Sequence, residues 1–167
     1  MSTIIHNTGT NYTLYYNAIN YFKTIMSNHP SIAVATYGEL TDFDYKQFPS
    51  YPIANVNILN TDFGTSVTNY TIQLIVADKV KNKNNESIGI HNMQRIPFFG
   101  IDDTVDALSN TLAIINDLTS YTQRGVQNFE INDEIICEPF VDRFNNGLAG
   151  WSATCLLYTS DAADDTP

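Results

Sequence analysis

The stretch Val67-Thr68-Asn69-Tyr70-Thr71-Ile72-Gln73-Leu74-Ile75-Val76-Ala77-Asp78 decides the fold, because apolar and polar residues alternate along most of it. One side of an extended chain then carries Tyr70, Ile72, Leu74 and Val76, and the other carries Asn69, Thr71 and Gln73. A period of two is typical of a β-strand with one face against a core. We therefore predict a long, half-buried strand from residue 67 to about residue 78.

The segment before this strand supplies its partner. Residues 53–59 also alternate, with Ala54, Val56 and Ile58 on one side and Asn55 and Asn57 on the other. A turn is predicted at Asn60-Thr61-Asp62-Phe63-Gly64, since Gly and Asn tolerate the backbone angles of turns. Two strands around a short glycine-containing connection predict an antiparallel hairpin.

Two helices flank the hairpin in the sequence. Residues 12–28 carry an apolar stripe and are stopped by Pro30, which cannot continue a helix. A second helix begins at Asp102 or Asp103 as N-cap and ends before Gly125. The predicted stripes are Leu14, Ala18, Phe22, Ile25 and Met26 in the first helix, and Val105, Leu108, Leu112, Ile115 and Leu118 in the second.

Three further strands complete the prediction. They are residues 31–38, a fourth strand from Phe129 through Cys137 into Phe140, and a last strand that opens at Trp151 after a turn at Asn145-Asn146-Gly147. The order of helices and strands predicts an α+β fold: an antiparallel or mixed sheet of about four to five strands, with two amphipathic helices packed on one face. Residues 1–154 are long enough for one such domain.

The C-terminal residues 155–167 are expected to be foreign to the protein. Cys155-Leu156-Leu157-Tyr158-Thr159-Ser160-Asp161-Ala162-Ala163-Asp164-Asp165 resembles the translation of a transposase-type sequencing adaptor. We therefore expect a truncated metagenomic fragment in which the natural sequence stops at Thr154, inside a strand. Without this adaptor-like tail, Asp161, Asp164 and Asp165 drop out and the formal net charge changes from −10 to −7.

The composition excludes several classes of protein. Eight Lys and Arg against 18 Asp and Glu leave no basic patch for gripping nucleic acid. Cys137 is the only cysteine before the tail, which excludes an intrachain disulfide and a thiolate metal cluster and fits a reducing compartment. The sequence shows no secretory leader and no apolar run of membrane-spanning length, so we expect a soluble protein that is not secreted.

No catalytic, cofactor-binding or metal-binding residue is predicted. The chain has no phosphate-binding glycine loop, no paired-histidine metal motif and no Gly-x-Ser-x-Gly elbow. His6, His29 and His91 are interpreted as surface residues, and Cys137 as a small core residue rather than a nucleophile. Asp102, Asp103 and Asp106 resemble a carboxylate cluster, but capping and the helix dipole explain acidic residues at a helix start.

Residues 79–101 interrupt the periodic pattern and form a long predicted loop or arm. Lys79, Lys81 and Lys83 are interleaved with asparagines, and Pro97-Phe98-Phe99 follows. A loop of this length inside a compact domain is usually functional or mobile. The lysines are interpreted either as a contact to an acidic partner or as a solvated loop tip.

Three segments together resemble a family of tailed-phage neck and tail-completion proteins with the tail-terminator-like fold. They are residues 74–80, 106–118 and 138–151, and the last is the most specific of the three. In similar proteins a strand ends in an aromatic residue, a polar turn follows, and Gly-Trp opens the final strand. The resemblance marks four fold anchors here: Phe140, Gly147, Gly150 and Trp151.

The resemblance implies a non-enzymatic structural protein of the phage virion, assembled in the bacterial host cytoplasm without cofactors. It implies a ring of about six subunits that closes the tail tube or joins it to the head connector, with DNA passing through unbound and no membrane contact. The expected subunit interface comprises Lys79, Lys81, Lys83, Pro97, Phe98 and Phe99. Two alternatives remain: another virion part, such as a head-closure or tail-sheath-linked subunit, and a small α+β enzyme or ligand-binding domain with a pocket under the 79–101 loop.

Overall fold

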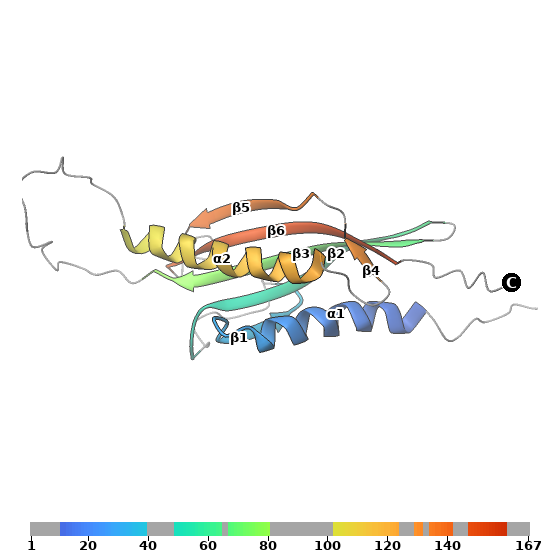
Figure 1. Ribbon diagram of the computed structural model, residues 1–167, viewed down its shortest axis with the longest axis horizontal. Helices are drawn as coiled ribbons and strands as arrows, with labels where there is room; N and C mark the ends of the chain where they lie inside the picture. The colour runs from blue at the N-terminus through green and yellow to red at the C-terminus, as the bar shows by residue number, and fades with distance from the viewer. Residues whose placement is uncertain are drawn as a thin grey trace, which may run out of the picture.

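The computed structural model describes residues 11–39, 49–64, 67–80, 102–123, 129–131, 134–141 and 147–159 (Figure 1). These residues form two helices and six strands. In chain order the elements are α1 (Asn11–Asn28), β1 (Val34–Tyr37), β2 (Ile53–Phe63), β3 (Thr68–Lys79), α2 (Asp102–Gln123), β4 (Phe129–Ile131), β5 (Ile136–Val141) and β6 (Leu148–Thr159). Neither described helix is long and apolar enough to cross a membrane.

The six strands form one mixed sheet in the order β1-β2-β3-β6-β4, with β5 also paired to β6. β1 is parallel to β2, and every other pair is antiparallel. β3 pairs with residues 148–158 of β6, so β4 and β5 share the opposite edge of that strand. The long hairpin predicted from residues 53–78 therefore lies in the middle of the sheet.

Both helices lie on the same face of this sheet (Figure 1). α1 packs over β1 and β2, and α2 packs over β3 and β6. Apolar residues of both helices and of alternating strand positions form the main core, in which the largest fully buried side chains include Phe22, Met26, Ile72, Leu74, Ile115 and Leu118. The structure confirms the predicted α+β class.

The predicted number of strands, about four to five, is too low. The predicted fourth strand, residues 129 to 140, is two strands: β4 pairs with residues 157–159 of β6, whereas β5 pairs with residues 149–154. The pairing register with β6 shifts by two residues between β4 and β5, so the two segments do not form one continuous strand. The sequence pattern alternates through both of them and does not reveal the break.

The turn predicted at Asn60–Gly64 is also misplaced. β2 continues to Phe63, and its pairing with β3 shifts by one residue between Ile58 and Asn60. Such a bulge accommodates one extra residue without ending the strand. The hairpin thus extends further than predicted, and it projects at one end of the molecule beyond the end of α2 (Figure 1).

The buried face of α2 differs from the predicted stripe. Ile115 and Leu118 are buried as expected, but Val105 is 57% exposed and Leu112 is 40% exposed. Threonines occupy part of the buried face instead: Thr111, Thr119 and Thr122. Each hydroxyl donates to a backbone carbonyl three or four residues earlier in the helix, which satisfies its hydrogen bond inside the core.

The other face of the sheet is partly buried as well. A second apolar cluster of Ile53, Ala77 and Leu148 lies there, with Phe140 packed against it. Asn55, predicted on the polar side of its strand, is only 1% exposed. Its amide donates to the Thr36 hydroxyl at 3.0 Å, but its Oδ1 atom is buried without a hydrogen-bond partner. The polar side of β2 is therefore buried at Asn55.

Residues 155–159 of the adaptor-like tail belong to β6 in this chain. They extend the antiparallel pairing with β3 as far as Tyr158 opposite Asn69. The side chains of Cys155 and Leu157 are buried in the main core. Residues 155–159 continue the alternation of β6: inward-facing positions 151 and 153 are followed by the apolar residues Cys155 and Leu157.

Candidate functional site

One of the predicted subunit-interface residues lies in the described part of the chain. Lys79 is exposed at the end of β3, where its backbone N–H donates to the carboxylate of Asp78 at 2.7 Å. The other five, Lys81, Lys83, Pro97, Phe98 and Phe99, lie outside the described residues.

Two of the predicted fold anchors face each other across a strand pair. Phe140 of β5 lies directly opposite Gly150 of β6 and packs against the cluster around Leu148. Gly150 has no room for a larger residue, because a Cβ atom there would lie 2.0 Å from the carbonyl oxygen of Val76. An aromatic residue opposite a strand glycine covers the surface that the missing side chain leaves bare.

The other two anchors lie at the start of β6. Gly147 has a φ angle of 66°, in the left-handed region that glycine adopts without strain, and its carbonyl accepts a hydrogen bond from the N–H of Val80. Trp151 is half-buried, and its indole N–H donates to the carbonyl of Leu108 in α2 at 2.8 Å. These contacts join the start of β6 to the end of β3 and to α2.

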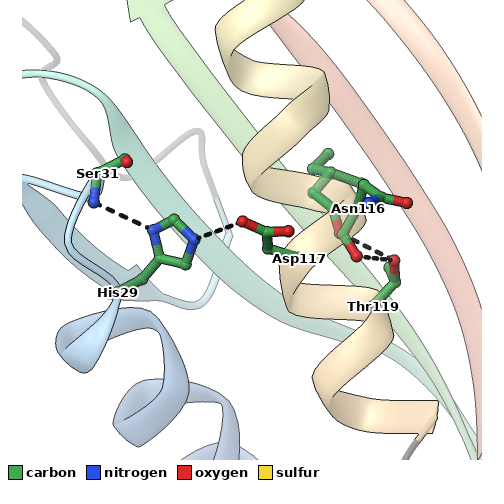
Figure 2. A network of polar contacts seen from close by, with 6 residues as sticks. His29, Ser31, Asn116, Asp117 and Thr119 are labelled. Carbon is green, nitrogen blue, oxygen red and sulfur yellow. Dashed lines mark hydrogen bonds and ion pairs between the residues drawn. The ribbon is translucent and has the colours of Figure 1, made fainter.

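His29 follows α1 directly, and the prediction that it lies at the surface is wrong. It is 8% exposed, because the chain turns at Pro30 and carries the imidazole ring between the two helices. Nδ1 accepts a hydrogen bond from the N–H of Ser31 at 3.2 Å. Nε2 lies 3.5 Å from a carboxylate oxygen of Asp117 in α2 (Figure 2). Since Nδ1 is an acceptor, the proton of the neutral ring is on Nε2 and points to Asp117.

This His29–Asp117 contact lies at a cavity of about 300 Å³ between α1 and α2. The lining consists of Ile25, Asn28, His29, Pro30, Asp117 and Tyr121. Asp117 and Tyr121 are one helical turn apart and belong to the exposed side of α2, with Asp117 58% exposed. Tyr21 of α1 also links the two helices, because its hydroxyl donates a hydrogen bond to the backbone carbonyl of Tyr121 in α2 at 3.4 Å. We call this cavity the α1–α2 pocket.

The α1–α2 pocket is suited to binding rather than to covalent chemistry. A carboxylate that orients a histidine is part of the arrangement that activates a nucleophile. However, the lining of this pocket contains no serine, threonine, cysteine or lysine. Sequence reasoning missed the pocket, because His29 and Asp117 are far apart in the chain and neither belongs to a motif.

Other candidate groups do not form a reactive cluster. Asp106, part of the acidic start of α2, is exposed, and the side chains of Asp102 and Asp103 lie outside the described residues. Burial raises the pKa of the Cys137 thiol, and burial together with nearby Cys137 raises the pKa of Cys155 to about 12. The described residues contain no group of three or more metal-ligating side chains.

The exposed apolar residues include several on the projecting hairpin. Phe63 at the end of β2 is 78% exposed, and Leu59 and Val67 are also exposed. Within the described chain, β1 pairs with β2 only from Ile53 to Val56, and no strand pairs with that edge from Asn57 to Phe63. We call residues 57–63 the open edge of β2.

Comparison with known proteins gives no family for this chain. Neither the scan against protein-family models nor the search of curated proteins finds a match.

Proposed function

We propose that this protein is a non-enzymatic structural subunit of a phage virion that associates with copies of itself in a ring at the neck or tail terminus. The observation that carries the proposal is the open edge of β2, which ends in the exposed side chain of Phe63. An unpaired strand edge presents rows of N–H and C=O groups that can pair with another chain.

The two edges of the sheet differ in a way that favours a directional contact. On the far side, the outer strand β5 contains Pro139, which has no N–H to donate. Proline on an edge strand is a common means of preventing sheet-to-sheet pairing. The open edge of β2 contains no proline along its seven residues. A contact that uses the β2 edge of one copy and a different surface of the next is head-to-tail, and such contacts generate rings when they close.

The charge of the described surface suits a ring through which DNA passes. The side chains in the described part include eight carboxylates and two amines, Lys23 and Lys79. Lys23 lies over the ring of Tyr37, 5.1 Å from the ring centre, in a contact within this chain. An acidic lumen repels phosphates and lets DNA slide without being held. The proposed partners are accordingly tail-tube and head-connector proteins of the virion.

Sedimentation of the purified chain over a wide concentration range tests the proposal. We expect a closed oligomer of defined size for the wild type, and mostly monomer for Phe63→Asp, since a charge at the hairpin tip disfavours an apolar contact. Tyr16→Asp is the matched control, because Tyr16 is also strongly exposed but lies on α1. A wild-type chain that stays monomeric at high concentration, and that binds neither tail-tube nor connector proteins, contradicts the proposal.

A small ligand-binding domain is the second candidate function. The α1–α2 pocket is the observation that favours this function. It lies between the two helices, whereas the sequence predicted a pocket under the 79–101 loop. Residues 81–101 of this loop lie outside the described residues. Saturable binding of a free small molecule that protects a monomeric chain against thermal unfolding would favour this candidate.

A further inference from the structure

The α1–α2 pocket has the chemical character of a receptor for a cation. Its polar rim holds the Asp117 carboxylate, and its apolar wall holds Ile25 and Pro30. Tyr121, one helical turn from Asp117, also lines the pocket, and aromatic faces attract ammonium and guanidinium groups. The lining of the pocket contains no lysine or arginine.

The end of α1 adds to this negative character. α1 ends at Asn28, which lines the pocket, and its last turn contains no basic residue. The C-terminus of a helix carries a partial negative charge, roughly half a charge at the last carbonyls. The Nε2 atom of His29 lies 3.5 Å from a carboxylate oxygen of Asp117 at the same end of α1 (Figure 2).

The size of the pocket is sufficient for one long side chain. Pockets for drug-sized ligands begin at roughly the volume of this one, about 300 Å³. Lysine and arginine side chains combine an aliphatic stem with a charged head, so the stem can lie on Ile25 and Pro30 while the head reaches Asp117.

The sequence contains a basic segment that could supply the cationic side chain for this pocket. Residues 79–101 contain Lys79, Lys81, Lys83 and Arg95 against a single acid, Glu86, in a chain with eight basic and 18 acidic residues overall. Half of the basic residues are thus concentrated in this one segment, and the rest of the chain is strongly acidic. Complementary charge of this kind directs association between protein surfaces.

We infer that the α1–α2 pocket binds a lysine or arginine side chain from the 79–101 segment of a second copy of this chain. The inference deepens the proposed function, since it assigns a second contact between neighbouring subunits. Asp117 pairs with the cationic head, Tyr121 stacks against it, and the contact joins the α1–α2 side of one copy to the basic segment of the next.

A labelled peptide of residues 79–101 tests the recognition directly. We expect saturable binding to the full chain, measured by fluorescence anisotropy, and a roughly three- to tenfold weaker affinity for Asp117→Asn, because the pair is partly exposed to water. Asp106→Asn is the matched control: it removes the same charge from an exposed position of α2 outside the pocket, and its affinity should equal that of the wild type. Equal binding to the Asp117→Asn chain overturns the inference.

A mixing experiment separates contact between copies from contact within one chain. One chain carries Asp117→Asn with an intact segment, and the other carries Lys79→Gln, Lys81→Gln, Lys83→Gln and Arg95→Gln with an intact pocket. We expect energy transfer between the two labelled chains to show tighter association in the mixture than either variant shows alone. Association in the mixture no tighter than in the separate variants overturns the contact between copies.

The outcome for the proposed function is read independently. If the ring forms equally well in the wild type and in Asp117→Asn, the contact at the pocket is contradicted and the proposed ring is still supported. If the wild-type chain forms no ring but its pocket binds the peptide in an Asp117-dependent manner, the proposed ring is contradicted. The specificity of the pocket for cations is then still supported. Free butylamine and guanidinium serve as competitors: displacement of the peptide supports recognition of the cationic head, and no displacement at saturating competitor contradicts it.

Discussion

The indole N–H of Trp151 donates a hydrogen bond to the backbone carbonyl of Leu108, at 2.8 Å, across the interface between β6 and α2. Leu108 lies in the first third of α2, and the hydroxyl of Thr111 donates to the same carbonyl at 3.2 Å. This carbonyl therefore accepts side-chain donors from a strand and from its own helix. The hydrogen bond from Trp151 therefore holds α2 in a fixed position along β6.

Replacing Trp151 by Phe removes this donor while keeping an aromatic ring. We expect a loss of about 1–3 kcal/mol in the free energy of unfolding, from the lost hydrogen bond and the smaller buried surface. For a domain of this size each kcal/mol corresponds to roughly 2–4 °C in Tm. Urea unfolding followed by far-ultraviolet circular dichroism measures it, since the variant has no tryptophan left to report fluorescence.

Thr111→Val provides the comparison for that prediction. It removes the second donor to Leu108 without removing the link to β6, and we expect a smaller loss than for Trp151→Phe. If both variants unfold at the same urea concentration as the wild type, the Trp151–Leu108 contact does not hold the helix to the sheet.

Gly150 and Gly147 are expected to respond differently to the same substitution. A Cβ atom at Gly150 meets the backbone at Val76 and Ala77, which cannot move without breaking the sheet. We expect Gly150→Ala to cost more than about 3 kcal/mol or to prevent folding. Gly147→Ala meets no atom closer than 4.0 Å and strains only its φ angle, at about 1–2 kcal/mol. Thermal melts of the two variants give the comparison, and an equal loss would contradict the close approach at Gly150.

Particular residues show how far the sequence predicts this fold. The alternation from residue 67 to 78 and the spacing of Phe22 and Met26 correctly predict a strand and a helix face, because burial on one side imposes a period. The burial of Asn55 and Thr111 is not predictable in this way. A polar residue enters the core when a partner satisfies it, and the partners here depend on the tertiary structure or on a helical carbonyl.

The candidate site shows a similar limit. Gly147 lies in a predicted turn and Trp151 is the only tryptophan of the chain, and the resemblance to the phage family predicts both as anchors. His29 and Asp117 are separated by 88 positions, and their contact follows only from the placement of α1 and α2 on the same sheet face. Without that arrangement, a histidine beside Pro30 is indistinguishable from a surface turn residue.

Substitution of Asn55 tests how much its buried, unpaired side-chain oxygen costs in stability. Its Oδ1 atom has no partner, and an unsatisfied buried acceptor costs roughly 1–3 kcal/mol. Asn55→Val removes this atom, suits a strand, and leaves Thr36 able to donate to the carbonyl of Ala54. We expect a stability equal to the wild type or up to about 1 kcal/mol higher. Asn55→Asp buries a charge in the same place and should lower Tm sharply, whereas a stabilised aspartate would indicate a buried partner at this position.

The two cysteines are expected to react at different rates. Burial and the neighbouring Cys137 raise the pKa of Cys155 to about 12, so almost none of it is thiolate at pH 8. Cys137 is only partly buried. We expect Cys137 to react with a disulfide reagent at least roughly a hundredfold faster in the folded chain, because the thiolate is the reactive form. Urea should abolish the difference, and Cys137→Ala identifies the fast thiol; equal rates in the folded chain would contradict the burial of Cys155.

Residues 155–159 complete β6 in this chain, so their removal should destabilise it. Cys155 and Leu157 are buried, and β4 pairs only with residues 157–159. A chain that ends at Thr154 loses two core side chains and the partner of β4, and we expect it to lose more than about 3 kcal/mol or to fail to fold. A chain that ends at Ser160 lacks only the part beyond β6 and should melt like the full chain.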